Sequence, residues 1–427
     1  MNLLDDLRWR GLLHQVTDAD LAHKALQDQK VTAYIGFDPT AASLHVGSLL
    51  QILLLARLGR AGHQPIAVVG GGTGRIGDPS GKSAERKLLS DADVAANVAS
   101  IHAQIGFVLQ NAGVEAKRID NAEWLCSQDL IGFLRDIGKH FSVNAMIARD
   151  SVKNRLEARE QGISYTEFSY MLLQAFDFVE LYRRHGCMAQ FGGSDQWGNI
   201  VSGIDLVERL ERRADGTLPH GPAFGVTVPL VTTKSGQKFG KTEAGAVWLD
   251  AQLTSPYQFY QFWMNSDDDD ALRYLAYFTF INQTDFAALK AAHLEAPHLR
   301  QAQRQLADEV TALVHPMQLQ SVQAATKVLF GGNPLDADVT TLEVLCGELP
   351  TAPLPADATV EQLLVGEGRP FASNGEARRA VAQNGVTISG QKFSGDVRAP
   401  LPAEAWLHGR YVLVRKGKKD WFLAVRA

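Results

Sequence analysis

The sequence has 427 residues, of which 45% are apolar, so the chain is long enough for two or three globular domains with sizeable cores. The longest apolar stretch, residues 49–56, is too short to span a bilayer, which argues against a membrane protein and for a cytoplasmic one. The three cysteines have neither disulfide nor metal-ligand spacing, so no zinc site or other protein-held metal is expected; they are Cys126, Cys187 and Cys346.

The net charge of −5 is unevenly distributed along the chain. Residues 361–427 carry 11 Lys and Arg against 6 Asp and Glu, whereas the rest of the chain is acidic. A basic tail on an acidic body favours a nucleic-acid partner for the tail. A solvated charged face would give the same counts.

Strands alternate with helices in the first 240 residues. Apolar runs predict strands at 31–37, 65–70, 186–193 and 226–233. Helices are expected at 49–59, at 93–110 and from about 195. This order predicts an α/β fold, a Rossmann-like doubly wound parallel sheet whose ligand lies at the carboxyl ends of the strands.

The second half of the chain changes character. Residues 255–330 are helical in pattern, and residues 331–360 contain four prolines and no Lys or Arg, which suits a linker. We therefore expect four segments: a catalytic domain at 1–250, a helical domain at 251–330, a linker at 331–358 and a small domain at 359–427.

The stretch "YIGFDPTAASLHVGS", residues 34–48, places His45 and Gly47 in the first turn of the helix at 49–59. A helix start has unpaired N–H groups and a partial positive charge, so it is suited to a phosphate, and Thr40 and His45 would add side-chain donors. By itself the pattern is also that of an ordinary capping histidine.

The glycine-rich stretch "GGGTGRIGDPSGKSAER" contains two near-matches to known motifs. Gly72–Gly77 has the dinucleotide-binding spacing, but Pro79 and Gly81 disfavour the long helix that should follow. Gly77–Gly81 encloses three residues where a P-loop has four. What remains is a glycine-rich loop whose Lys82 and Arg86 could meet phosphate charge.

The stretch "SYTEFSYMLLQAFDFVELY" predicts a helix capped by Ser164. Tyr170, Gln174 and Asp177 share one face of this helix. A carboxylate flanked by two phenylalanines needs a partner, either a polar ligand or a buried arginine.

Two further stretches follow predicted strands. "QFGGSDQWGN" ends a strand with two glycines and then presents Asp195, which suits the hydroxyls of a nucleotide ribose. "KSGQKFGKT" is a loop with Lys234, Lys238 and Lys241, which could approach a polyphosphate.

Together, "HVGS" and "KFGKT" resemble the paired HIGH and KMSKS elements of class I aminoacyl-tRNA synthetases. With "YIGFDPT", "GDPSGK", "YMLLQAFDF" and "GGSDQWGN" in this order, the chain resembles bacterial-type tyrosyl-tRNA synthetases over essentially its whole length. The resemblance implies activation of L-tyrosine with ATP and Mg²⁺, followed by transfer of tyrosine to tRNA(Tyr) by a homodimer.

The resemblance also assigns residues. For tyrosine it implies Tyr34 and Asp177 at the phenol hydroxyl, Asp78, Tyr170 and Gln174 at the ammonium, and Gln190 nearby. For ATP and the adenylate it implies Gly36, Asp38, Gly47, Ser48, Gly193, Asp195 and Gln196. For the departing pyrophosphate it implies Thr40, His45, Lys82, Arg86, Lys238 and Lys241. Ser48 departs from the family, which has a second histidine there, so its role is the least defined.

The tail, with "EARRAVAQNGVTISGQK" and "RYVLVRKGKKDWFLAV", resembles the α+β S-four-type RNA-binding domain. The resemblance implies that Arg378, Arg379 and Lys392 contact RNA. Three other classes stay open: an RNA-binding protein that has lost catalysis, a tryptophanyl enzyme and a nucleotide-dependent dehydrogenase.

Overall fold

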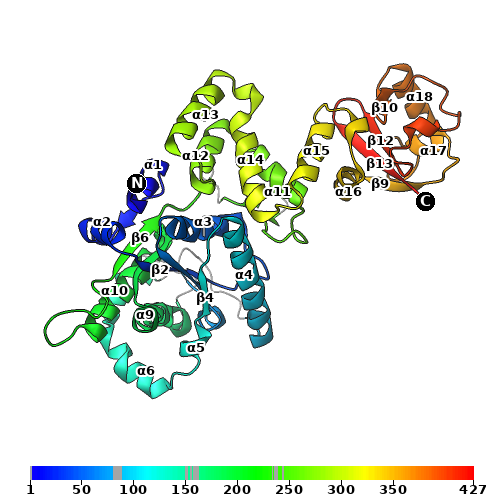
Figure 1. The fold of residues 1–427 in the computed structure, drawn as a ribbon. Coiled ribbons are helices and arrows are strands. Elements are labelled where there is room, and N and C mark those ends of the chain that lie inside the picture. The colour runs from blue at the N-terminus through cyan, green and yellow to red at the C-terminus, as the bar shows by residue number, and fades with distance from the viewer. Residues whose placement is uncertain are drawn as a thin grey trace. The chain divides into compact units, whose positions relative to one another are not determined.

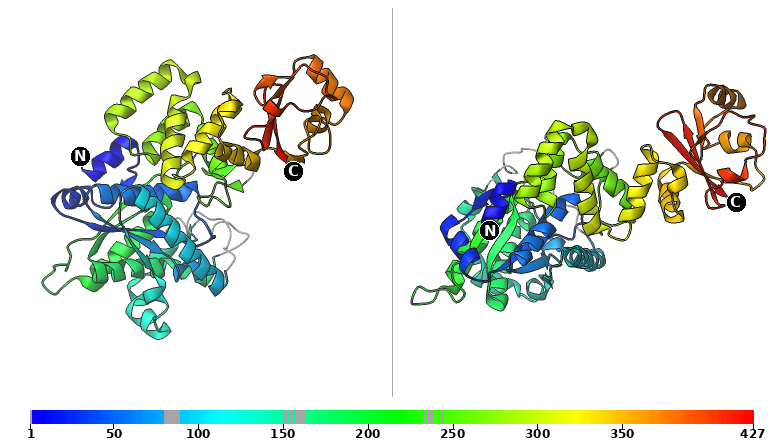
Figure 2. Two further views of the ribbon diagram at one scale, coloured as in Figure 1. Left: turned by 45° about the vertical axis from the view of Figure 1, so that its right-hand side comes forward. Right: turned by 45° about the horizontal axis from the view of Figure 1, so that its top comes forward.

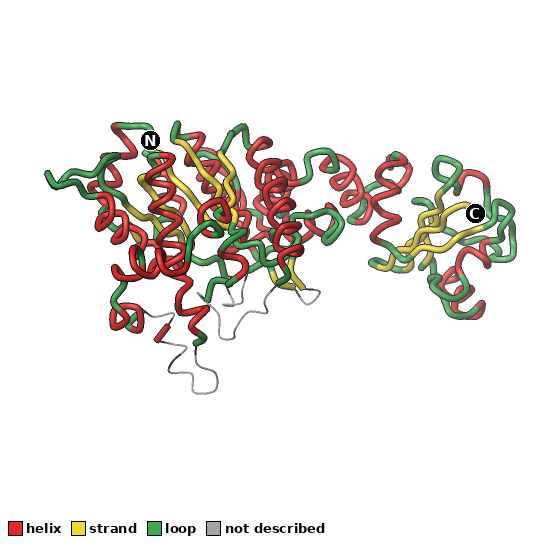
Figure 3. The backbone as a smooth tube through the Cα atoms, turned by 90° about the horizontal axis from the view of Figure 1, so that it is seen from below, coloured by secondary structure: helices red, strands yellow, loops and turns green. Residues whose placement is uncertain are grey.

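The computed structural model describes residues 2–79, 89–149, 152–153, 156, 163–232, 234, 239–242 and 245–427, with the backbone alone for Lys241 and Thr242. The chain divides into two compact units, each of which is described by itself. The first unit comprises Met1–Ser255 and Gln261–Val314, and the second comprises Pro256–Tyr260 and His315–Ala427. Figure 3 distinguishes the strands, helices and loops of both units.

The first unit is built on a six-stranded sheet in the order β1-β6-β5-β2-β3-β4 (Figure 1). The strands are β1 (Gln15–Val16), β2 (Thr32–Phe37), β3 (Gln64–Val69), β4 (Lys117–Asp120), β5 (Cys187–Gly193) and β6 (Phe224–Val228). All pairs are parallel except β1 with β6. The strand order reverses between β2 and β5, which confirms the predicted doubly wound sheet and places its switch point there.

Helices cover both faces of this sheet, with α3 (Val46–Arg60) on one face and α9 (Tyr165–His185) and α10 (Trp197–Glu211) on the other (Figures 1 and 2). The leucine-rich α3 is buried along most of its length because it packs between the sheet and neighbouring helices. Short helices complete this part: α1 (Leu3–Arg10), α2 (Ala19–Asp28), α5 (Ala122–Leu125), α6 (Leu130–Asp136) and α7 (Val143–Ile147).

Helix α4 (Asp91–Asn111) is, within the described residues, the one helix long and apolar enough in composition to cross a membrane. Its apolar side, which includes Val94, Ile101 and Ile105, is buried, and the helix contacts α3 and β3. This is the arrangement of a core helix that covers a sheet.

The helical pattern predicted for 255–330 is confirmed. The helices are α11 (Pro256–Met264), α12 (Asp268–Phe278), α13 (Gln283–Glu295), α14 (Gln301–Val314) and α15 (Leu319–Leu329). In the second unit α15 packs on α16 (Val339–Glu348).

The second unit also holds a five-stranded sheet in the order β11-β10-β12-β13-β9. Its strands are β9 (Thr351–Leu354), β10 (Val386–Ile388), β11 (Gln391–Lys392), β12 (Tyr411–Lys416) and β13 (Asp420–Arg426). Helices α17 (Val360–Leu364) and α18 (Asn374–Ala382) share an apolar core with the sheet. The predicted helix, turn and strand at the start of the basic tail are therefore present.

The predicted linker at 331–358 is wrong, because this segment contains α16 and β9. Leu342 and Leu345 of α16 are fully buried. Pro353 lies within β9, where proline is tolerated because β9 is an edge strand paired only with β13. The prolines that indicated a linker thus belong to a folded unit, and the compact units divide at His315 rather than near residues 330 and 358.

Candidate active site

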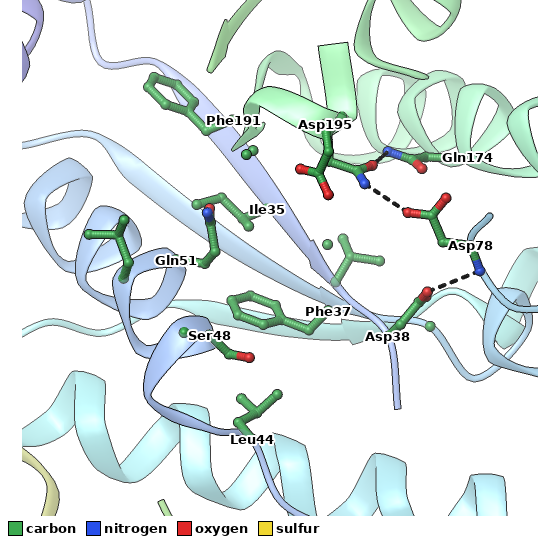
Figure 4. A pocket seen from close by; sticks show the side chains of 18 of the residues that line it. Ile35, Phe37, Asp38, Leu44, Ser48, Gln51, Asp78, Gln174, Phe191 and Asp195 are labelled. Atoms are coloured by element: carbon green, nitrogen blue, oxygen red, sulfur yellow. Dashed lines mark hydrogen bonds between the residues drawn. The ribbon is translucent and has the colours of Figure 1, made fainter. Parts of the chain in front are cut away.

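A cavity of about 550 Å³ opens at the carboxyl ends of β2 and β5, at the switch point of the sheet (Figure 4). It collects predicted tyrosine, ATP and pyrophosphate residues from β2, α3, α9 and β5 and from the loops after β2, β3 and β5. These are Tyr34, Gly36, Asp38, Thr40, His45, Gly47, Ser48, Asp78, Tyr170, Gln174, Asp177, Gln190, Gly193, Asp195 and Gln196. Segments far apart in sequence thus meet at one cavity.

Four predicted pyrophosphate-binding residues cannot be placed. Lys82, Arg86 and Lys238 lie outside the described residues, and Lys241 is described only as part of the backbone of β7 (Lys241–Thr242). Lys234, on the same loop as Lys238, forms an ion pair with Asp269, with 2.5 Å between Nζ and Oδ2.

Asp177 is held at one wall of the cavity by two buried donors. Trp124 Nε1 donates to Oδ1 at 2.7 Å, and Asn121 Nδ2 donates to Oδ2 at 2.9 Å. Burial raises the pKa of Asp177 to about 7, although both hydrogen bonds act in the opposite direction. Among the described residues, an indole and an amide partner this carboxylate, in place of the buried arginine that the sequence left open.

Asn121 was missed by the sequence analysis, yet it is fixed as firmly as Asp177. Its Oδ1 accepts from the backbone N–H of Gly72 at 2.8 Å, and its Nδ2 also donates to Thr73 Oγ1 at 3.0 Å. Asn121 directly follows β4, so its position at the carboxyl end of a parallel strand was the available signal. Trp124, one turn later in α5, carried no such signal.

The Tyr34 phenol stands near Asp177 and is 1% exposed. Its oxygen has no hydrogen-bond partner among the described residues, and neither has Oε1 of Gln190. Burial and the charge of Asp177 raise the pKa of Tyr34 well above 10, so the phenol remains protonated and can donate. Buried polar groups normally have partners, so the two atoms indicate a polar ligand in this part of the cavity.

Amides and carboxylates form a connected row on the neighbouring wall. Gln196 Nε2 donates to Asp78 Oδ2 at 2.7 Å, and Gln174 Nε2 donates to Gln196 Oε1 at 3.1 Å (Figure 4). The Tyr170 hydroxyl donates to Asp38 Oδ1 at 3.2 Å, and the Asp78 backbone N–H donates to Asp38 Oδ2 at 3.4 Å. Two carboxylates linked in this way, with uncharged donors around them, suit a cationic ligand group.

At the start of α3, His45 is the N-cap residue. The Gly47 N–H donates to His45 Nδ1 at 2.9 Å, so in the neutral imidazole the proton is on Nε2. Capping therefore fixes the tautomer that offers a donor. Gly47 has no room for a side chain, because a Cβ atom there would lie 2.7 Å from His45 Cε1.

The predicted RNA-binding residues lie in the second unit. Arg378 and Arg379 are exposed on α18, and Lys392 is exposed on β11. Arg378 Nη2 lies 3.8 Å from Glu361 Oε2, and Arg379 Nε donates to the backbone oxygen of Gly375 at 3.2 Å. In the described part of the chain, no group of three His, Cys, Asp or Glu side chains could hold a metal ion.

Comparisons with known proteins agree with this geometry. Residues 26–331 match the family model of class I tRNA synthetases (W and Y), and residues 341–424 match that of the tyrosine-tRNA ligase SYY-like C-terminal domain. Curated tyrosine-tRNA ligases of Thermobifida fusca and Anaeromyxobacter dehalogenans are 49% and 50% identical, with 98% and 99% of each chain covered. A C-terminally truncated mitochondrial tyrosyl-tRNA synthetase of Aspergillus nidulans superposes with a TM-score of 0.70 at 32% identity, over 77% of this chain and 94% of that one.

The doubly wound sheet and the capped helix start at its cavity are those of a class I aminoacyl-tRNA synthetase of the tryptophan and tyrosine group. Within that group the chain belongs to the tyrosine-tRNA ligase family, because the curated relatives match it from end to end. It is an ATP-dependent ligase that activates L-tyrosine to tyrosyl-adenylate and charges tRNA(Tyr). This excludes a dehydrogenase, a tryptophanyl enzyme and a purely RNA-binding protein.

Proposed function

We propose that the Tyr34–Asp177 end of the cavity receives the phenol of tyrosine and that the start of α3 receives the phosphates of ATP. The observation that carries this assignment is the pairing of a protonated, unpartnered phenol with a carboxylate held by Asn121 and Trp124. A phenol hydroxyl is both donor and acceptor, so it can accept from Tyr34 and donate to Asp177.

The ammonium of tyrosine would lie against the row of amides and carboxylates. Asp78 and Tyr170 would face it, with Gln174 and Gln196 fixing their orientation. Asp38, assigned by resemblance to ATP, accepts from Tyr170 and therefore lies between the two substrates. Gly193 and Asp195 would line the ribose from the end of β5.

The activation step then needs no general base, because the tyrosine carboxylate is ionised at neutral pH. A carboxylate oxygen attacks the α-phosphorus, and the bond from this phosphorus to the bridging oxygen breaks as pyrophosphate leaves. Catalysis is positioning together with stabilisation of charge on the phosphates. His45 Nε2–H, Thr40 and the N–H groups that start α3 would donate to phosphate oxygens. Lys82, Arg86, Lys238 and Lys241 would add positive charge, and Mg²⁺ bound to ATP would supply more.

Exchange of labelled pyrophosphate into ATP, without tRNA, tests the phenol assignment. Tyr34→Phe removes the neutral hydrogen bond proposed between Tyr34 and the substrate phenol, so kcat/KM for tyrosine should fall about 5- to 10-fold. The residual kcat/KM for phenylalanine should not fall, because phenylalanine has no hydroxyl to form this bond. Asp177→Ala should narrow the preference for tyrosine over phenylalanine further.

Tyr182→Phe is the matched control, because Tyr182 is also buried but donates to the backbone oxygen of Gly221 at 2.8 Å. It should leave the preference for tyrosine unchanged. If Tyr34→Phe behaves like Tyr182→Phe, the phenol of the substrate does not bind at Tyr34.

We also propose that the enzyme works as a homodimer in the cytoplasm. Apolar side chains are exposed on α6 and α7: Leu130 at 72%, Ile131 at 68%, and also Leu134, Val143 and Ile147. The opposite sides of these helices contribute Phe133 and Met146 to a buried cluster, so the exposed sides are free for another protein. A second copy is the partner that the family resemblance favours.

We propose that the second unit binds tRNA(Tyr) through Arg378, Arg379 and Lys392. The excess of Lys and Arg over Asp and Glu in residues 361–427, and the match of residues 341–424 to the C-terminal domain of tyrosine-tRNA ligases, support this role. Contacts of this kind recognise phosphates and shape more than sequence.

A further inference from the structure

Phe239 lies in the "KFGKT" element, yet it is 4% exposed and surrounded by aromatic rings. All four rings belong to the first unit, two from the end of α11 and two from α12. The distances between ring centroids are 5.4 Å to Phe262, 5.7 Å to Trp263, 4.8 Å to Tyr274 and 5.3 Å to Phe278. Such packing holds an aromatic side chain in one place.

The next residue connects this aromatic cluster to the start of α3. Gly240 has φ +77°, and a Cβ atom there would lie 2.7 Å from Val46 Cγ2, so its backbone lies directly on the first residue of α3. The Gly240 carbonyl accepts from Val247 N–H at 3.0 Å, and the Val247 carbonyl accepts from Val46 N–H at 2.9 Å. An unbroken series of contacts therefore runs from the aromatic cluster to the capped helix start.

Helix α12 also holds the chain just before this element. Arg273 donates to the Thr232 carbonyl at 2.5 Å, and the Lys234 N–H donates to Asp270 Oδ2 at 3.0 Å. Helix α12 thus contacts both Phe239 and the chain at residues 232 and 234.

We infer that Phe239 is a positioning residue for the activation step. Its packing in the aromatic cluster of α11 and α12 fixes the position of the α3 start relative to the ATP phosphates. This inference rests on the proposed role of the α3 start. Phe239 lines the cavity, and it is connected to the start of α3 through Gly240, Val247 and Val46. A purely structural role would lower stability without slowing the reaction of the folded enzyme.

Single-turnover formation of tyrosyl-adenylate by the full chain, with saturating tyrosine and ATP, tests the inference. Phe239→Leu keeps an apolar side chain but not the ring contacts. It should slow the reaction between about 10- and 100-fold, since small displacements of reacting groups cost rates of this order. The Kd for tyrosine alone should stay within about 2-fold, because Tyr34 and Asp177 are untouched.

Phe224→Leu is the control for the loss of a buried ring away from the cavity, because Phe224 in β6 is also buried and, unlike Phe239, is not among the residues that line the cavity. It should lower the Tm comparably and leave the rate within about 2-fold. Phe278→Leu opens the same cluster from α12, and combined with Phe239→Leu it should slow the reaction much less than the product of the two single losses.

The inference is overturned if Phe239→Leu keeps the parent rate, if Phe224→Leu slows the reaction equally, or if the Phe239 and Phe278 losses multiply. His45→Ala separates the underlying assignment from the inference. If His45→Ala keeps the parent rate, the proposed phosphate role of the α3 start fails, whatever Phe239→Leu does.

Discussion

Asp177 shows at the scale of one residue what the sequence could and could not predict. Its position between two phenylalanines indicated a buried carboxylate in need of a partner. The partners, Asn121 and Trp124, lie more than fifty positions earlier and follow a different strand. Spacing along one helix predicts which residues share its face, but contacts across a sheet depend on strand order, which no local pattern contains.

The raised pKa of Asp177 gives a stability test. The ordinary value is 3.8 and the folded value is about 7, so between them the folded protein binds a proton that the unfolded chain does not. The stability of the parent therefore falls as pH rises from 3.8 to about 7 on account of this group, and levels off above. The Asp177→Asn variant lacks this titration, so its stability does not fall for this reason. The Tm difference, variant minus parent, should therefore increase as the pH rises from 3.8 to about 7.

Thermal unfolding without ligands, followed from pH 4 to pH 9, measures this difference. Asp120→Asn is a suitable comparison, because Asp120 is nearby but not fully buried. A Tm difference for Asp177→Asn that stays constant with pH would show that the carboxylate is already ionised throughout the window.

At the scale of elements, the central strands were predictable because parallel strands buried on both faces are continuous apolar runs. The helix predicted at 49–59, with His45 and Gly47 in its first turn, begins at Val46 and has His45 as its cap. The segment 331–358 was mispredicted because composition does not distinguish an edge strand containing proline from a linker.

The cap of α3 can be tested through Gly47. Gly47→Ala would place a Cβ atom 2.7 Å from His45 Cε1 and 2.9 Å from Nδ1, so the imidazole must move and the donor at Nε2 moves with it. We expect pyrophosphate exchange to slow between about 10- and 100-fold, with the KM for tyrosine little changed. A variant with normal exchange would show that His45 does not need its capped position. Gly62→Ala serves as the control, because Gly62 follows the other end of α3 and has φ +90°, so stability alone should respond.

At the scale of the whole molecule, the basic tail at 361–427 is one part of the second compact unit, whose sheet also includes β9 from the segment before it. Charge composition predicted the kind of partner, whereas the residues that meet RNA depend on which arginines face outward. Arg369, for example, donates to the Pro353 carbonyl at 2.8 Å and is occupied within the fold.

The RNA-binding proposal predicts a salt effect. In a variant carrying both Arg378→Gln and Lys392→Gln, affinity for tRNA(Tyr) should fall, and the slope of log affinity against log salt should decrease by about 0.7 to 0.9 for each lost phosphate contact. Pyrophosphate exchange should be unchanged. Filter binding at several salt concentrations measures the slope. If the variant binds more weakly but keeps the slope of the parent, these side chains do not contact phosphates.

The homodimer proposal predicts that Ile131→Asp dissociates the enzyme, because a carboxylate would be buried between two apolar surfaces. Sedimentation equilibrium should give twice 46.6 kDa for the parent and 46.6 kDa for the variant. Leu294→Asp, at an exposed leucine of α13, should leave the mass at that of the parent. If the parent enzyme also sediments with a mass of 46.6 kDa, the homodimer proposal is refuted.

The parallel pairing of β9 with β13 has a consequence for biosynthesis. A strand near residue 351 can take its place in the sheet only after the strand ending at Arg426 has left the ribosome. The first unit can fold while translation continues. Residues 256–260 belong to the second unit, so they can pack in it only after the later residues of that unit have been synthesised. A nascent chain stalled before β13 would therefore hold the sheet of the first unit without a complete sheet in the second, the unit proposed to bind tRNA.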